Sequence, residues 1–105
     1  MKEILIFLVT LHGLIHLIGF VKAFKPGMVK RFKQPISKVD GLLWLTACIL
    51  FLVSALLLVV QSEHWWMPAA AATFVSQYLV ILIWPDAKFG TLGNAMLLAL
   101  IALRY

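Results

Sequence analysis

Four apolar stretches separated by short polar turns make up most of the chain, and each predicts a helix. They cover about residues 4–23, 41–60, 66–84 and 92–104. At 1.5 Å per residue the first is long enough to cross a hydrocarbon core of about 30 Å. The fourth, at about 20 Å, is short for such a core, so we expect it to sit off-centre, to thin the bilayer or to extend further.

Short connections make successive helices antiparallel. The pattern therefore predicts an all-α fold, an integral membrane four-helix bundle with up-down-up-down topology, in which residues 1–105 form a single transmembrane domain. Residues 37–40 resemble a capping box that opens the second helix. Thr91 is the expected cap of the fourth helix. Trp65 and Trp66 follow the polar turn at 61–64 and match the aromatic belt of a membrane surface.

Two histidines lie deep in the first stretch, one helical turn apart. On an ideal helix His12 and His16 share a narrow stripe with Gly19 and Ala23. The opposite side is apolar and suits lipid; it consists of Phe7, Leu11, Leu14, Ile18 and Val21. A charge at this depth costs roughly 2.5 to 3.5 kcal/mol, so we expect both imidazoles to be neutral, hydrogen-bonded and turned into protein.

The other helices offer matching inward faces. The second helix carries small residues every seven positions, at Gly41, Cys48, Ala55 and Ser62, which allow a neighbouring helix to approach closely. The third is expected to turn inward Trp66, Ala70, Thr73, Gln77, Val80 and Trp84, and the fourth Gly90, Asn94, Leu97 and Ile101. The predicted buried polar seam comprises His12, His16, Cys48, Thr73, Gln77 and Asn94, with Ser54 and Ser76 as further possible partners of the histidines.

Composition and charge favour the membrane over a soluble domain. The chain is 64% hydrophobic with a mean hydropathy of +1.04, against roughly 45 to 50% apolar residues in soluble domains. The net charge of +5 comes mainly from one loop and its flanks, which hold six of the nine basic residues: Lys22, Lys25, Lys30, Arg31, Lys33 and Lys38. We expect these residues to contact anionic lipid head groups. Without a base-reading motif, this clustering argues against nucleic-acid binding.

The same asymmetry predicts orientation. The first loop is strongly basic and the middle turn has no Lys or Arg, so the first and third loops should be cytoplasmic and both termini outside. The expected location is the bacterial plasma (inner) membrane. The apolar run after Met1 lacks a small-residue cleavage site, so we interpret it as a retained helix rather than a signal peptide.

Catalytic and metal-binding patterns are sparse. One cysteine, Cys48, permits neither an intramolecular disulfide nor a finger-type zinc site. His12 and His16 have the i, i+4 spacing of a metal-binding helix but lack the intervening glutamate of metalloproteases. They cannot both be axial ligands of one haem from the same face. A transition metal or haem at these histidines therefore remains an alternative that needs further ligands, and no cofactor is the primary expectation.

At LHGLIHLIGFVKAF, QPIS with GLLWL, and WPDAKFGTLGN the sequence resembles an uncharacterised family of four-helix bacterial membrane segments, sometimes found ahead of an extramembrane domain. The resemblance covers nearly the whole chain, and it implies the four-helix fold but no activity. The first helix is also loosely similar to that of DoxX-like membrane proteins.

Two functions follow as hypotheses. The first is a small, non-enzymatic membrane bundle that packs with itself or with a membrane protein partner, as an anchor, accessory or interaction subunit. The alternative is a redox, metal or haem site, or a site for small-solute or proton transport, built around His12 and His16.

Overall fold

In a computed structural model, the secondary structure of the described residues, 2–25, 27 and 36–103, is helical and includes no strand. The helices are α1 (Lys2–Ile15), α2 (Leu17–Phe24), α3 (Lys38–Val59), α4 (Trp66–Leu82), α5 (Trp84–Ala87) and α6 (Gly90–Ala102). α1 and α2 form one rod interrupted at His16, so the expected all-α, four-helix fold is confirmed. The rod predicted over about 4–23 is present as one span, Glu3–Phe24, with a local break in its backbone hydrogen bonding at His16.

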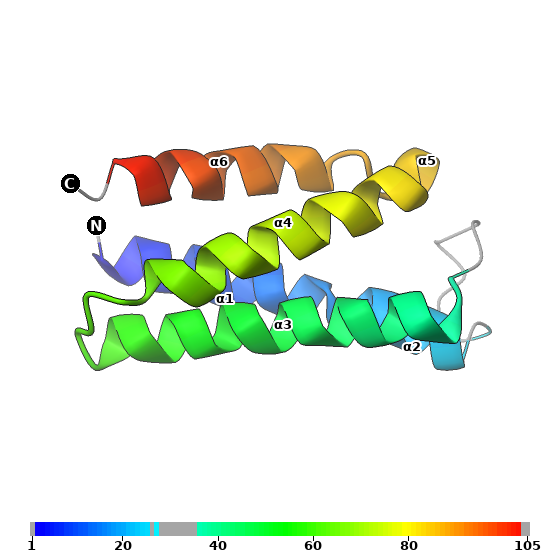
Figure 1. The fold of residues 1–105 in the computed structure, drawn as a ribbon, viewed down its shortest axis with the longest axis horizontal. Helices are drawn as coiled ribbons and strands as arrows, with labels where there is room; N and C mark the ends of the chain where they lie inside the picture. The colour runs from blue at the N-terminus through cyan, green and yellow to red at the C-terminus, as the bar shows by residue number, and fades with distance from the viewer. Residues whose placement is uncertain (1, 26, 28–35, 104–105) are drawn as a thin grey trace.

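The four rods run antiparallel along one long axis (Figure 1). The chain ends lie together near the turn between α3 and α4, which we call the turn end; the opposite end, where α2 finishes and α3 begins, is the basic end. The body measures 41 × 21 × 20 Å. α3 packs against both α1/α2 and α4, and α4 packs in turn against α6.

Two apolar clusters occupy the interior. The turn-end cluster contains Val9, Phe51, Ala55, Leu58, Ala72 and Leu97. The basic-end cluster contains Ala23, Ile36, Trp44, Leu79 and Ile83. The first draws on all four rods, whereas the second has no residue from α6.

Close helix contacts depend on glycine. A Cβ on Gly13 would lie 2.7 Å from the Cβ of Phe51, and one on Gly19 would overlap the indole of Trp44. Gly41 of α3 is equally tight against Ala23. The expected small-residue stripe of α3 is buried at Gly41, Cys48 and Ala55, although Ser62 lies beyond the end of the helix.

The ends of α3 follow local rules. Its start is capped as predicted, because the backbone N–H of Asp40 donates to Ser37 Oγ at 3.1 Å. At its other end Gln61 has φ 62°, and Ser62 N–H donates to Leu57 O at 2.9 Å while Gln61 N–H donates to Leu58 O at 3.1 Å. This is the Schellman arrangement, here with glutamine where glycine is usual.

The last crossing differs from the prediction. α6 begins at Gly90 rather than near Leu92, and Phe89 rather than Thr91 precedes it as the cap residue. α5 lies beyond the start of α6 (Figure 1). α6 is shorter than the two long rods, and its accommodation to a bilayer stays a prediction. The predicted inner stripe of α6 is correct at Asn94, Leu97 and Ile101, which are buried.

The inward face of α4 is rotated relative to the prediction. Its buried residues are Ala69, Ala72, Thr73, Ser76, Leu79 and Val80. Thr73 and Val80 were expected there, but Trp84, in α5, is 46% exposed. Four of these six residues, Ala69, Ala72, Thr73 and Ser76, are small, and small residues let neighbouring helices approach closely.

Candidate functional site

His16 interrupts the first rod by bonding to its own helix. Its Nδ1 lies 2.7 Å from the carbonyl oxygen of His12, the atom that its backbone N–H would reach in a regular α-helix. That N–H instead donates to Gly13 O at 3.0 Å. The ring therefore replaces the backbone N–H as the donor to His12 O. The backbone hydrogen bond of His16 spans three residues instead of four, which narrows the helix between α1 and α2.

The same bond determines the tautomer of His16. A carbonyl oxygen only accepts, so Nδ1 carries the hydrogen and Nε2 presents its lone pair. Ser76 Oγ, on α4, lies 2.6 Å from Nε2 and donates to it. His16 is 2% exposed and Ser76 fully buried. Both ring nitrogens are thus used by protein groups in a fixed direction.

His12 starts a second chain of hydrogen bonds that joins α1, α6 and α4. Its Nε2 donates to Asn94 Oδ1 at 2.8 Å. Asn94 Nδ2 donates to Gln77 Oε1 at 3.1 Å, and Gln77 Nε2 donates to Thr91 Oγ1 at 3.1 Å. We call these side chains, together with His16 and Ser76, the histidine layer.

Aromatic rings and a glycine enclose this layer. The two imidazole centroids are 4.9 Å apart, edge to face. Phe51 lies 5.0 Å from His12 and 5.3 Å from His16, while Trp44 lies 5.2 Å from His16. A Cβ on Gly93 would be 2.8 Å from His12 Cε1, so this glycine admits α6 to the layer. Since Phe51 and Trp44 belong to different clusters, the layer separates the two halves of the interior.

The predicted polar seam is only partly assembled in one place. His12, His16, Gln77 and Asn94 lie together, and Ser76 is one of the partners considered for the histidines. Thr73 instead donates to Ala69 O of its own helix at 2.7 Å. Ser54 donates to Trp65 O at 2.7 Å. Cys48 is buried at 2% exposure but is not a link in either hydrogen-bonded chain.

Thr91 is the member of the layer that sequence reasoning assigned to another role. Its three-residue spacing from Asn94 places both side chains on one face of α6. That spacing could have placed Thr91 in the polar seam, but Thr91 was expected to cap the helix instead.

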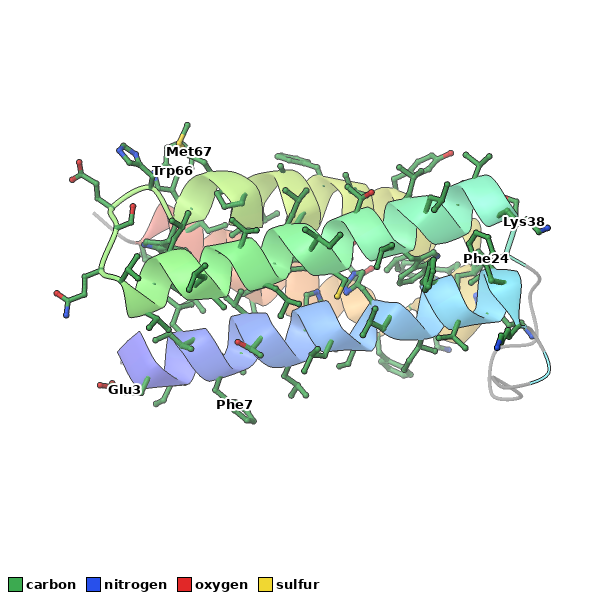
Figure 2. The ribbon with its side chains drawn as sticks, turned by 90° about the horizontal axis from the view of Figure 1, so that it is seen from below. Glu3, Phe7, Phe24, Lys38, Trp66 and Met67 are labelled. Atoms are coloured by element: carbon green, nitrogen blue, oxygen red, sulfur yellow. The ribbon has the colours of Figure 1, made fainter. Side chains whose placement is uncertain are left out.

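The predicted basic residues fall into two groups. Lys22 and Lys25 at the end of α2, and Lys38 at the start of α3, lie at the basic end. Figure 2 shows Lys38 and Glu3 at opposite ends of the bundle. Lys30, Arg31 and Lys33 lie outside the described residues.

Both ring nitrogens of His16 are paired, and His12 Nε2 is paired with Asn94. Among the side chains that the structure describes in residues 3–25 and 36–103, which leave out Asp86, every buried nitrogen and oxygen has a hydrogen-bond partner. No three His, Cys, Asp or Glu side chains of that set could hold one metal ion. The Ser76–His16 pair has the spacing of an activated nucleophile. Ser76 is nevertheless fully buried, so a substrate has no open path to it.

Two helical rods are long and apolar enough to cross a membrane. They are Glu3–Phe24 and Lys38–Val59, each of 22 residues. α4 and α6 are apolar but shorter. Comparison of the chain with protein-family models, with curated proteins and with solved structures finds no match.

Proposed function

We propose that the chain is an integral membrane bundle that acts as an anchor, accessory or interaction subunit without catalysis of its own. The observation that carries the proposal is its apolar outer surface. Phe7 points away from the bundle in Figure 2 and is 62% exposed. Large apolar side chains at least 45% exposed occur on α1, α3, α4 and α6, including Ile4, Leu11, Leu56, Val59, Phe74, Ile81, Leu92 and Met96. Water disfavours such a surface, whereas lipid tails accommodate it.

Burial and charge support the same proposal. The most apolar windows of the two long rods are only 22% and 39% buried, whereas the core helix of a soluble protein would be mostly buried. The charged residues of these rods lie in their end turns, at Lys2, Glu3, Lys22, Lys38 and Asp40. The bundle length of 41 Å is close to the roughly 40 to 45 Å of a bilayer with its head groups.

The hydrogen bonds of the histidine layer support a structural role for the histidines. His16 offers no free nitrogen to a metal, haem or proton carrier while it bonds to His12 O and Ser76. Bonds of this type between membrane helices contribute about 0.6 kcal/mol each. Their main effect is to fix which faces of α1, α4 and α6 meet.

The orientation we propose follows from the positive-inside bias. The basic end would face the cytoplasm of a bacterial cell, in contact with anionic head groups, and the turn end with both termini would lie outside the plasma membrane. The outward apolar faces would contact lipid, a second copy or a membrane protein partner.

Membrane extraction and spectroscopy test this function together. Washing membranes with alkaline carbonate should leave the expressed chain in the pellet, and release into the supernatant would contradict the proposal. The purified protein should show no Soret band and substoichiometric metal by elemental analysis. A haem spectrum, or one bound metal per chain lost on His12→Gln or His16→Asn, would favour the redox or metal alternative.

Transport needs its own test. Proteoliposomes loaded with a pH-sensitive dye should acidify at the same rate with and without the protein. A proton flux that the wild-type protein supports and His12→Gln abolishes would overturn the structural role of the layer.

A further inference from the structure

A small pocket opens at the basic end, between the first turns of α3 and the last turns of α4. Its volume is about 170 Å³, and it is lined by Ile36, Asp40, Trp44, Leu79, Leu82 and Ile83. It exists because α4 runs obliquely to α3 and the two helices diverge toward this end (Figure 1).

The lining of this pocket favours a cation. Among the described residues that line it, Asp40 is the one with a charged side chain. The opposite wall is the last turn of α4, where a helix carries partial negative charge. These features supply negative charge from two separate elements.

The remaining walls favour an alkyl-substituted cation over a metal ion. Trp44 presents an indole, the best aromatic surface for an organic cation, and Leu79, Leu82 and Ile83 are aliphatic. A hydrated metal ion would gain little from these groups. The volume admits one short alkylammonium group but not a whole lipid.

We propose that this pocket binds the primary ammonium group of an aminophospholipid of the phosphatidylethanolamine type. This inference rests on the proposed membrane-spanning function, which places the start of α3 at the depth of the head groups. A primary ammonium can donate hydrogen bonds to the Asp40 carboxylate, which a choline group cannot do. The acyl chains would follow the outer surface, where Val39 is 70% and Leu82 47% exposed.

Native mass spectrometry of the full chain in detergent tests whether lipid binding needs the negative charge of Asp40. Titration with phosphatidylethanolamine should give tighter binding than phosphatidylcholine or phosphatidylglycerol. Asp40→Asn should weaken binding of the ethanolamine lipid about tenfold or more, and Asp40→Glu should retain most of it. Glu63→Gln, at the turn end, is the matched control and should bind as wild type does.

A second variant tests the pocket without changing charge. Leu82→Trp should fill the mouth and weaken binding of the ethanolamine lipid to a similar degree, while Phe74→Trp, on an exposed face of the same helix, should not. Unchanged binding in both Asp40→Asn and Leu82→Trp would overturn the proposal, as would equal binding of phosphatidylglycerol.

One further titration distinguishes a lipid head group from a soluble amine. Free phosphoethanolamine should bind far more weakly than the lipid, and equal affinity would assign the pocket to a soluble amine instead. Failure of the pocket is distinguishable from failure of the proposed function, because Asp40→Asn and Leu82→Trp should remain in the carbonate-washed membrane pellet whether or not they bind lipid.

Discussion

The two halves of the interior are built differently on either side of the histidine layer. The turn-end cluster contains one large ring, Phe51, surrounded by aliphatic and small side chains from four rods. The basic-end cluster contains a larger ring, Trp44, which fits only because Gly19 leaves space for it. α4 diverges from α3 in this half and leaves a pocket, whereas the turn end is closed by α6.

The two interior clusters differ in how many rods hold them together. A cluster shared by all four rods resists any local change, since each rod holds the others in place. The cluster at the other end depends on a ring and a glycine, and α6 contributes no buried residue to it. The histidine layer between them fixes the register that both halves require.

Removal of the Phe51 ring should have the largest effect, because it is fully buried and contacts both imidazoles. Phe51→Ala should lower the free energy of unfolding by about 3 kcal/mol, chiefly through the cavity and lost packing. Unfolding in mixed detergent with increasing sodium dodecyl sulfate measures this. Phe74→Ala, at a position 70% exposed, should change little, and equal effects of the two would refute the closed turn-end cluster.

Filling the space at Gly19 should disrupt the basic-end half next most strongly. Gly19→Leu displaces the indole of Trp44 and should cost about 1 to 3 kcal/mol in the same assay. The double variant Gly19→Leu with Trp44→Leu should recover part of that loss, because the volume is then restored. Additive losses would show that the glycine and the indole do not share one space.

Breaking the histidine layer should lower the free energy of unfolding by less. The part due to the bond itself should appear as coupling between His12 and Asn94. Asn94→Leu removes both the acceptor for His12 and the donor for Gln77. The coupling between His12→Leu and Asn94→Leu in a double-mutant cycle should be about 0.6 kcal/mol. His12→Gln should be tolerated better than His12→Leu because it can keep the bond to Asn94. Zero coupling would mean that the observed bond does not contribute to register.

Relief of strain at the turn should give the smallest change, and a gain. Gln61 has the left-handed φ of 62°, a conformation that glycine adopts without the steric cost of a Cβ. Gln61→Gly should stabilise the protein by up to about 1 kcal/mol, whereas Gln61→Ala should give no such gain. A loss of stability in Gln61→Gly would show that the glutamine side chain holds the turn.

The sequence predicted those features of the helices that depend on local pattern and local chemistry. The small-residue stripe at Gly41, Cys48 and Ala55 and the cap at Ser37 follow from local pattern and chemistry, and the structure has both. The depth of His12 and His16 also indicated that their partners lie on other helices, and the interhelical bonds to Asn94 and Ser76 have that form.

The break at His16 could not be predicted in the same way. A histidine within an apolar helix gives no sign that its Nδ1 will bond to a carbonyl one turn earlier, because that choice depends on Ser76 holding the other nitrogen from a distant helix. The rotation of α4 was missed for a related reason. Helical spacing grouped Trp84 with Gln77, whereas α4 ends at Leu82 and buries Ala69 and Ala72 instead.

Labelling of single cysteines from one side of the membrane tests the central claim most directly. In a Cys48→Ala background, cysteines at Lys25 and Lys88 should react with a membrane-impermeant maleimide only from the cytoplasmic side. A cysteine at Glu63 should react only from the outside, and one at Leu56, which is 60% exposed, should stay unreactive until detergent is added. Reaction of the cysteines introduced at Lys25 and Glu63 from the same side would contradict a bundle that spans the bilayer. Free reaction of the cysteine at Leu56 in intact membranes would contradict it as well.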